Sequence, residues 1–276
     1  MLDFGVCELN ARIPAFFQLD RYNISPEDIA HGVLHCEPDA IHSSVIVTPC
    51  WKPEVFAEAA DQVTEIAPGS VYQLTYRCQQ FSLIRSGIGA PQTGDVVLAL
   101  GCTPCDTLIF TGSVGGLAPG LQIGDLMVIE KSFCGDGFSR YLDAQVVPGD
   151  CFLQPAAPDP DLTGQIRKHA AETARNKSVP LHHGIVFSTD SIVAQFCRLE
   201  YFAQELGCIG IEMETAAVFR AAKLVGIKAG ALLQVSDIPV TNKSLYSGRT
   251  RPDGERRVSI RRDVLARIIV DSLIVL

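Results

Sequence analysis

Long apolar runs are absent from this sequence, and so is an excess of positive charge. No run reaches the roughly 20 apolar residues that cross a bilayer. The segment Met1–Ala15 has neither the basic start nor the apolar middle of a signal peptide. The formal net charge is −8, which argues against a nucleic-acid-binding surface. We therefore expect a cytoplasmic protein that binds neither membrane nor nucleic acid.

The sequence also lacks a complete motif for a metal or a cofactor. Its ten cysteines are scattered through apolar segments, which favours reduced core thiols over a disulfide framework. Cys102 and Cys105 form one close pair, but no second pair completes a zinc site. Ser86–Pro91 is similar to a dinucleotide fingerprint, yet Gln92 stands where the third glycine is needed. We predict no cofactor and no bound metal.

Apolar residues are abundant enough for one large core. Of the 276 residues, 47% are hydrophobic, so the chain can form a single domain. We assign residues 44–276 to that domain and residues 1–43, which three prolines interrupt, to an irregular N-terminal arm. Strand and helix patterns predict an α/β fold, with helices expected from about Pro53 to about Ile66 and from about Arg256 to Ser272.

The most informative stretch is Cys208–Asp237. Cys208–Ile211 is short and apolar, Thr215–Val225 has helical spacing, and Ala229–Val235 is apolar again. This pattern predicts a parallel βαβ unit, in which ligands bind beyond the carboxyl ends of the strands. Those ends carry Glu212, Met213 and Glu214 on the first strand and Ser236 and Asp237 on the second. Two glutamates alone are typical of a helix N-terminus, but an aspartate directly after a buried strand indicates a site.

The sequence Ile-Glu-Met-Glu-Thr-Ala-Ala from Ile211, followed by a strand ending in Val-Ser-Asp, resembles the superfamily of nucleoside phosphorylases and methylthioadenosine/S-adenosylhomocysteine nucleosidases. The resemblance covers roughly residues 44–275. It implies a three-layer fold with a central mixed, twisted sheet and helices on both faces. It also implies cleavage of the bond between ribose and a base, and a homo-oligomer, either a dimer or a hexamer.

Three other segments carry the resemblance. Thr111–Pro119 is the longest match, and its Gly112 and Ser113 are expected to hold an anion or a polarised water. Gly87 belongs to a loop expected beside the ribose. Ser188 follows Phe187, which is the candidate aromatic over the base. The alternatives are a purely structural glycine turn and a core role for the phenylalanine.

The expected acceptor depends on two positions. Phosphorylases of the family place an arginine three residues before the serine of the glycine loop, and here that residue is Phe110. A phosphate dianion would then lose charge-assisted hydrogen bonds. Glu54 matches a nucleosidase glutamate that activates water, although it could instead complement a helix N-terminus. We therefore predict hydrolysis, with phosphorolysis as the alternative if Arg85 or Lys52 replaces the missing cation.

The resemblance implies a mechanism for a purine nucleoside. Asp237 would protonate the purine N7, and Glu214 would accept both ribose hydroxyls. Met213 would pack under the ribose, and we assign Glu212 and Ser236 to the same substrate site. Uridine-type relatives lack an acid at the position of Asp237, so purine is favoured over pyrimidine. The alternative from another class is a non-catalytic nucleoside-binding protein.

A basic segment follows the last predicted strand. Its arginines are Arg249, Arg251, Arg256, Arg257, Arg261 and Arg262. We expect them to form a solvated face that balances an acidic protein, rather than a clamp for a 5'-phosphate.

Overall fold

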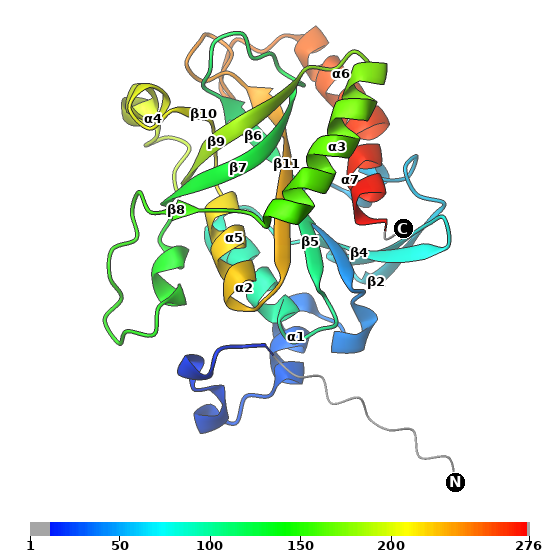
Figure 1. Ribbon diagram of the computed structural model, residues 1–276, viewed down its shortest axis with the longest axis vertical. Helices are drawn as coiled ribbons and strands as arrows, with labels where there is room; N and C mark the ends of the chain where they lie inside the picture. The colour runs from blue at the N-terminus through cyan, green and yellow to red at the C-terminus, as the bar shows by residue number, and fades with distance from the viewer. Residues whose placement is uncertain (1–11, 275–276) are drawn as a thin grey trace.

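The computed structural model describes residues 12–274, which fold around one mixed β-sheet (Figure 1). The strands are β1 (Ser44–Thr48), β2 (Gln62–Ala67), β3 (Val71–Tyr76), β4 (Gln79–Arg85), β5 (Thr107–Phe110), β6 (Ser113–Gly116), β7 (Leu126–Gly135), β8 (Pro155–Ala156), β9 (Leu181–Thr189), β10 (Cys208–Glu212) and β11 (Lys228–Asp237). Their order in the sheet is β2-β3-β4-β1-β5-β11-β6-β10-β9-β7-β8. Because β11 also pairs with β7, the strands from β11 through β6, β10 and β9 to β7 close into a ring.

Helices connect most of these strands. The α-helices are α1 (Pro26–Leu34), α2 (Ala90–Leu100), α3 (Pro160–Asn176), α4 (Leu199–Gln204), α5 (Thr215–Leu224), α6 (Arg251–Ile260) and α7 (Ala266–Leu273). The 3₁₀ helices are η1 (Ala15–Phe17), η2 (Leu19–Tyr22), η3 (Pro38–Ala40), η4 (Pro53–Val55), η5 (Phe138–Leu142) and η6 (Phe196–Arg198), and a π-helical turn, η7 (Arg261–Leu265), joins α6 to α7. Within residues 12–274, every helix is too short or too polar to cross a bilayer.

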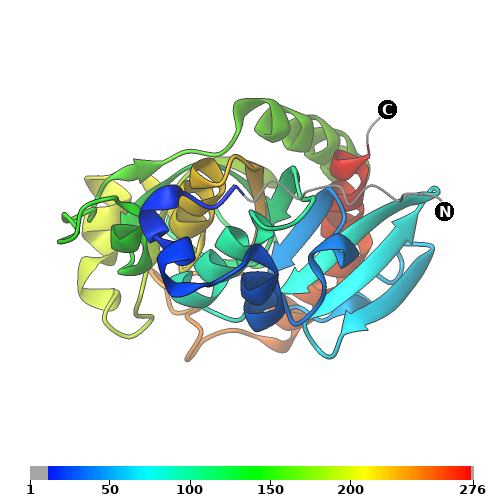
Figure 2. The same cartoon turned by 90° about the horizontal axis from the view of Figure 1, so that it is seen from below.

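Side chains of the central strands alternate between two apolar cores. Val45 and Val47 of β1 belong to the core with α1, α2 and α5, whereas Ile46 belongs to the core with α3 and α7. These two groups of helices cover opposite faces of the sheet (Figure 1, Figure 2). The predicted α/β fold with a central mixed sheet and helices on both faces is therefore confirmed.

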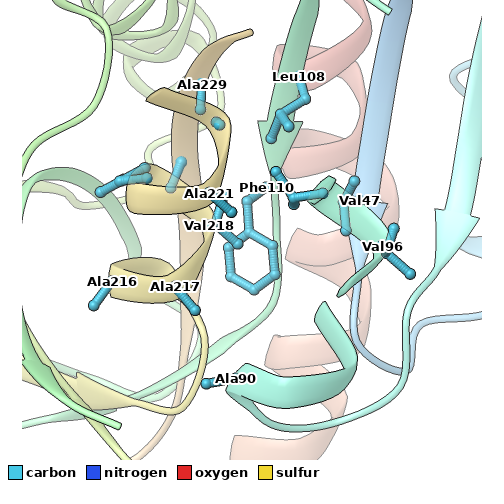
Figure 3. Close-up of a cluster of buried hydrophobic side chains, with 14 of the residues drawn as sticks. Val47, Ala90, Val96, Leu108, Phe110, Ala216, Ala217, Val218, Ala221 and Ala229 are labelled. Carbon is cyan, nitrogen blue, oxygen red and sulfur yellow. The ribbon is translucent and has the colours of Figure 1, made fainter. Parts of the chain in front are cut away.

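Phe110 lies in the first of these cores, the one beneath α2 and α5. Its ring is surrounded by Val47, Val96 and Val218 (Figure 3), and the residue is 1% exposed. An arginine at this position would bury a guanidinium among apolar side chains, at a high cost in free energy. The strand therefore uses this position for packing, and it supplies no cation.

The stretch Cys208–Asp237 contains the predicted strand, helix and strand, but the predicted parallel βαβ unit is wrong. Both strands pair with β6, which is parallel to β11 and antiparallel to β10. The two strands therefore run in opposite directions. Gly115 of β6 lies between them, with Ile211 as its partner on one side and Asp237 on the other. This shared neighbour brings the two carboxyl ends together.

The helix expected after Pro53 is also wrong. The structure has only the short η4 there, and the chain then enters β2. Val63, Thr64 and Ile66 are β-branched, which suits a strand better than a helix. Antiparallel pairing with β3, in which Val63 lies opposite Leu74, outweighs the helix signal of the proline.

The predicted C-terminal helix begins earlier than expected. Thr250 and Asp253 form a capping box that starts α6 at Arg251. At the other end of the chain, α1 starts with a second capping box, and its Ala30 and Leu34 are fully buried in the first core. The described part of the N-terminal arm is thus packed against the sheet domain from α1 onward.

Candidate active site

One cavity lies where β6, β10 and β11 meet. Six of the predicted site residues line it: Ser113, Glu212, Met213, Glu214, Ser236 and Asp237. Glu212 ends β10, Asp237 ends β11, and Ser113 begins β6. The closed ring of strands therefore gathers side chains that lie as far apart in the chain as Ser113 and Asp237.

Glu212 is held by hydrogen bonds to both of its carboxyl oxygens. Its Oε1 accepts from the hydroxyls of Ser188 and Thr215, and the Thr215 bond is 2.6 Å long. Its Oε2 accepts the backbone N–H groups of Glu214 and Thr215, each at 2.7 Å. Burial raises the pKa of Glu212, and these four donors oppose that effect. Glu212 thus caps the first turn of α5 and fixes the backbone that carries Glu214.

Glu214 reaches across to the glycine loop before α2. Its Oε1 accepts the backbone N–H of Gly89 at 2.6 Å, and the residue is 5% exposed. Burial, followed by the nearby charge of Glu212, raises the pKa of Glu214 to about 8. A proton on this group is therefore easily gained or lost near neutral pH.

Asp237 is buried beside Ser236. The Ser236 hydroxyl donates to Oδ1 of Asp237 at 2.7 Å, and the aspartate is 3% exposed. Burial raises the pKa of Asp237, while Ser236, Arg249 and the Leu245 backbone lower it by smaller amounts. A buried carboxyl with a raised pKa that faces a cavity is suited to donating a proton.

Arg257 and Arg261 do not belong to a fully solvated basic face, which corrects the prediction for these two residues. Arg257 lines the cavity, and one nitrogen of each guanidinium is buried. Arg256 is half-buried as well and pairs with the buried Asp125. Arg251, by contrast, is exposed and pairs with Glu255 on the same helix.

Glu54 does not lie where the predicted base for water activation has to be. The helix that was to begin near it does not form, its side chain is exposed, and it is not among the residues that line the cavity. Glu54 lies instead in the first turn of the short η4. The sequence match therefore does not translate into proximity to the other site residues.

Phe187 is a core residue and not an aromatic cover for a base. It is 1% exposed and stacks on Phe202 with a ring-centroid distance of 3.8 Å. Ser188 points to the opposite side of β9, because successive side chains of a strand alternate. It is also buried, and it contacts Glu212 instead of the cavity. Ser188 thus serves the site through another residue.

Gly87 and Gly112, the two glycines assigned to substrate binding, are instead required by the local structure. Gly87 has φ +89°, and a Cβ there would lie 1.7 Å from Oε1 of Gln92. Gly112 packs against Pro49, which a Cβ would approach to 3.3 Å. Neither glycine lines the cavity. The close approach at Gly112 brings the end of β1 next to Ser113.

Several residues of the site were not found from the sequence. Gly89 binds Glu214 through its backbone, and Cys50 and Arg257 line the cavity. The second glycine of Ser-Gly-Ile-Gly was a usable signal for the first of these, because its φ of +100° suits glycine. Thr189, Ile192 and Gln195, in and after β9, also line the cavity, and no sequence motif marks them.

Comparison with known proteins identifies the family. Residues 46–259 match the model of the phosphorylase superfamily. The chain is 29% identical over 198 residues to the DeoD-type purine nucleoside phosphorylase of Mycoplasma genitalium, which covers 71% of this chain and 80% of the relative. It is 31% identical over 196 residues to the 5'-methylthioadenosine/S-adenosylhomocysteine nucleosidase of Actinobacillus succinogenes, covering 67% and 80%. The solved uridine phosphorylase of Vibrio fischeri has a TM-score of 0.68 and 24% identity, covering 84% of this chain and 92% of that chain.

The chain therefore belongs to the phosphorylase superfamily, which confirms the resemblance of its motifs. Its named relatives include nucleoside phosphorylases and a nucleosidase, and the chain is an enzyme of this nucleoside-cleaving superfamily. The alternative of a non-catalytic nucleoside-binding protein is set aside. The expected homo-oligomer and the cytoplasmic location stay predictions.

Proposed function

We propose that this enzyme cleaves the N-glycosidic bond of a purine nucleoside, with Asp237 as the acid and Glu214 as the ligand of the ribose. The observation that carries the proposal is the meeting of these two buried carboxyl groups in one cavity. Departure of the base leaves negative charge on the base and positive charge on the sugar. Catalysis therefore needs a proton near the first and an anion near the second.

Each group has a role that its surroundings support. Asp237 donates its proton to the purine N7, and its raised pKa keeps that proton available closer to neutral pH. Glu214 accepts the ribose hydroxyls while Gly89 holds one of its oxygens, and Met213 packs under the sugar. We assign Glu212 to positioning Glu214, because both of its oxygens already accept hydrogen bonds.

The acceptor of the ribose is the second part of the proposal. The expectation of hydrolysis rested on Glu54 and Phe110, and the first lies outside the cavity while the second faces the core. Glu54 therefore gives no support to hydrolysis, whereas Phe110 still leaves the glycine loop without a cation for phosphate. The half-buried guanidinium of Arg257, which lines the cavity, favours an anionic acceptor, as in phosphorolysis, with hydrolysis as the alternative.

Asp237→Asn tests the assignment of the acid. The variant keeps the shape of the side chain but has no proton of suitable acidity, so we expect turnover to fall by about 10²–10⁴-fold. Base release should be measured by chromatography for a panel of purine and pyrimidine nucleosides, each with and without phosphate. Far-UV circular dichroism should show an unchanged fold.

Asp161→Asn provides the matched control, because this aspartate is exposed on α3 and should leave turnover unchanged. Full activity of Asp237→Asn would reject the acid role. Release of bases from pyrimidine nucleosides only would reject the substrate class.

A further inference from the structure

Two exposed aromatic side chains stand beside the active-site cavity. Phe196 directly follows Gln195 and Tyr246 directly follows Leu245, and both Gln195 and Leu245 line the cavity. The two rings contact each other, with a centroid distance of 6.1 Å and an angle of 45° between their planes. We call Phe196 and Tyr246 the aromatic pair. It joins the loop after β9 to the loop after β11 at the edge of the cavity.

Further apolar side chains of these two loops are exposed to solvent. Val193 belongs to the loop after β9, and Val240 and Leu245 belong to the loop after β11. Burial of apolar surface is favourable, and exposed apolar groups gathered beside a cavity mark a place where an apolar group binds. The cavity itself has a volume of about 210 Å³, below the roughly 300–1,000 Å³ of most ligand pockets. A ligand with a bulky substituent therefore has to extend past the cavity onto these loops.

Hydrogen bonds within the loop after β11 hold Tyr246 in place. Ser244 Oγ accepts the backbone N–H groups of Tyr246 and Ser247, each at 3.3 Å. The guanidinium of Arg249 donates to the backbone oxygen of Leu245 at 3.0 Å. These bonds involve the backbone on both sides of Tyr246, so the position of its ring does not depend on contacts of the ring itself.

The turn that carries Phe196 is held in a similar way. Ser191 Oγ accepts the backbone N–H of Ala194 at 3.0 Å, and Arg198 donates from its side chain to the backbone oxygen of Ala194 at 3.2 Å. The backbone N–H of Arg198 donates to the backbone oxygen of Gln195 at 2.8 Å. Because both loops are already ordered, a ligand that contacts the aromatic pair loses little binding free energy to ordering them.

The proposed acid determines which edge of a purine faces the aromatic pair. Asp237 gives its proton to N7 in the proposed function, and the exocyclic group on C6 lies beside N7 on the same edge of the base. Leu245 lines the cavity together with Asp237, and its backbone lowers the pKa of that carboxyl. A substituent on the C6 amino group therefore leaves the cavity beside Leu245 and meets Tyr246 next.

We propose that the aromatic pair determines specificity for purine nucleosides whose C6 amino group carries an apolar substituent, such as a benzyl group. The substituent packs against the rings of Phe196 and Tyr246 outside the cavity. The proposal rests on the proposed function for the orientation of the base, and it names the substrate class of the same site. N7, N9 and the ribose are unchanged in such nucleosides, so Asp237 and Glu214 act on them as on any purine nucleoside.

Binding of free bases to the intact protein tests the aromatic pair without turnover. In isothermal titration, 6-benzylaminopurine should bind at least about tenfold more tightly than adenine, because the benzyl ring buries apolar area and gains ring contacts. The isomer 2-benzylaminopurine carries the same ring on the edge remote from N7. It should gain less than about threefold over 2-aminopurine. No binding of 6-benzylaminopurine, or equal gains for the two isomers, would overturn the proposal.

Variants of the aromatic pair locate the gain. Tyr246→Ala and Phe196→Ala should each reduce the tenfold preference for 6-benzylaminopurine to about threefold or less, whereas Tyr246→Phe keeps the ring and should keep the preference. Tyr201→Ala is the matched control, because Tyr201 is 45% exposed, close to the 41% of Phe196, but lies on α4 and does not line the cavity. A preference that stays unchanged in both alanine variants would overturn the proposal.

A contact between two copies of the chain is the alternative use of this surface. Size-exclusion chromatography with light scattering measures the mass of the unaltered protein and of Tyr246→Ala. Equal masses, together with a lost preference in the variant, would support the proposal. A smaller assembly in the variant, with the preference for 6-benzylaminopurine unchanged, would assign the aromatic pair to the contact between copies and overturn it.

Turnover separates this inference from the proposed function. The ratio of kcat/KM for N6-benzyladenosine to kcat/KM for adenosine should exceed about ten in the unaltered protein and fall in Tyr246→Ala. Cleavage of adenosine without any preference for the benzyl derivative would overturn the role of the aromatic pair and leave the proposed cleavage intact. The expected binding preference without cleavage of any purine nucleoside would reject the proposed function and support the binding surface.

Discussion

The two walls of the cavity treat their charged groups in opposite ways. On the wall formed by β10 and α5, Glu212 accepts four hydrogen bonds from the protein itself. On the wall that Arg257 of α6 lines, Nε of that guanidinium is buried and has no hydrogen-bond partner in the described part of the protein. A satisfied buried network makes a site rigid, whereas unpaired groups carry a free-energy penalty until a ligand binds. The protein itself therefore satisfies the polar groups around Glu212, whereas it provides no partner for Nε of Arg257.

Replacement of Glu212 removes the acceptor of all four hydrogen bonds on the first wall. We expect it to have the largest effect on stability. In Glu212→Ala, two hydroxyls and two backbone N–H groups lose their acceptor inside the protein. We expect the free energy of unfolding to fall by about 3–5 kcal/mol, because bonds to a charged acceptor contribute roughly 1.5–3 kcal/mol each and do not add fully. Urea denaturation at neutral pH measures the change.

Glu205→Ala is the control for this change, because Glu205 is exposed and its replacement should alter the unfolding free energy by less than about 0.5 kcal/mol. Glu212→Gln should lie between the two, since an amide oxygen can still accept the backbone N–H groups. A loss of under about 1 kcal/mol in Glu212→Ala would mean that the network does not stabilise the first wall.

The raised pKa of Glu214 predicts that the free energy of unfolding depends on pH. Its pKa of about 8 in the folded protein lies above the ordinary 4.5, so the folded state binds the proton more tightly. The stabilisation is fully present below pH 4.5 and is lost as the pH rises through 8. Relative to Glu214→Gln, which cannot titrate, the unaltered protein should lose on the order of 2–3 kcal/mol of unfolding free energy between pH 5 and pH 8.

Urea titrations of both proteins at pH 5, 6, 7 and 8 measure this difference, and Glu205→Gln supplies a control whose difference should be independent of pH. A constant difference between Glu214→Gln and the unaltered protein would show that Glu214 is ionised throughout. If Glu214→Gln also loses turnover, the expected pH-dependent difference would mean that Glu214 is needed for catalysis although its ionisation lowers stability at neutral pH.

The carboxyl groups of the site could be predicted from the sequence far better than its arginines. Glu212, Glu214 and Asp237 stand directly at the ends of apolar strands, so local pattern alone locates them. Their meeting was predicted for the wrong reason, because the strands are antiparallel and are joined through Gly115 of β6. Strand direction depends on pairing between distant segments, which periodicity does not report.

The second wall depends on tertiary packing from the start. Arg257 and Arg261 are two of six arginines in one segment. Tertiary contacts distinguish them, because Arg261 lies over Trp51 and Arg257 lines the cavity with Cys50. Phe187 and Ser188 show the same limit. They are adjacent in sequence, yet one stacks in the core and the other binds Glu212, because a strand directs them to opposite sides.

Asp237 accepts one side-chain hydrogen bond, from Ser236, and so lies between the fully paired Glu212 and the unpaired Nε of Arg257. Ser236→Ala removes that bond, and we expect the smallest effect from it. The Ser236 hydroxyl donates to Oδ1 of Asp237, and this bond favours the ionised carboxylate and holds the pKa of Asp237 below the level that burial alone would set. Its loss should raise that pKa and extend the protonated, active form to higher pH. The alkaline limb of the pH profile of kcat/KM for base release should therefore move up by at most about one unit. A shift to lower pH would mean that the limb reports another group, because removing a donor to a carboxylate cannot make that carboxyl more acidic.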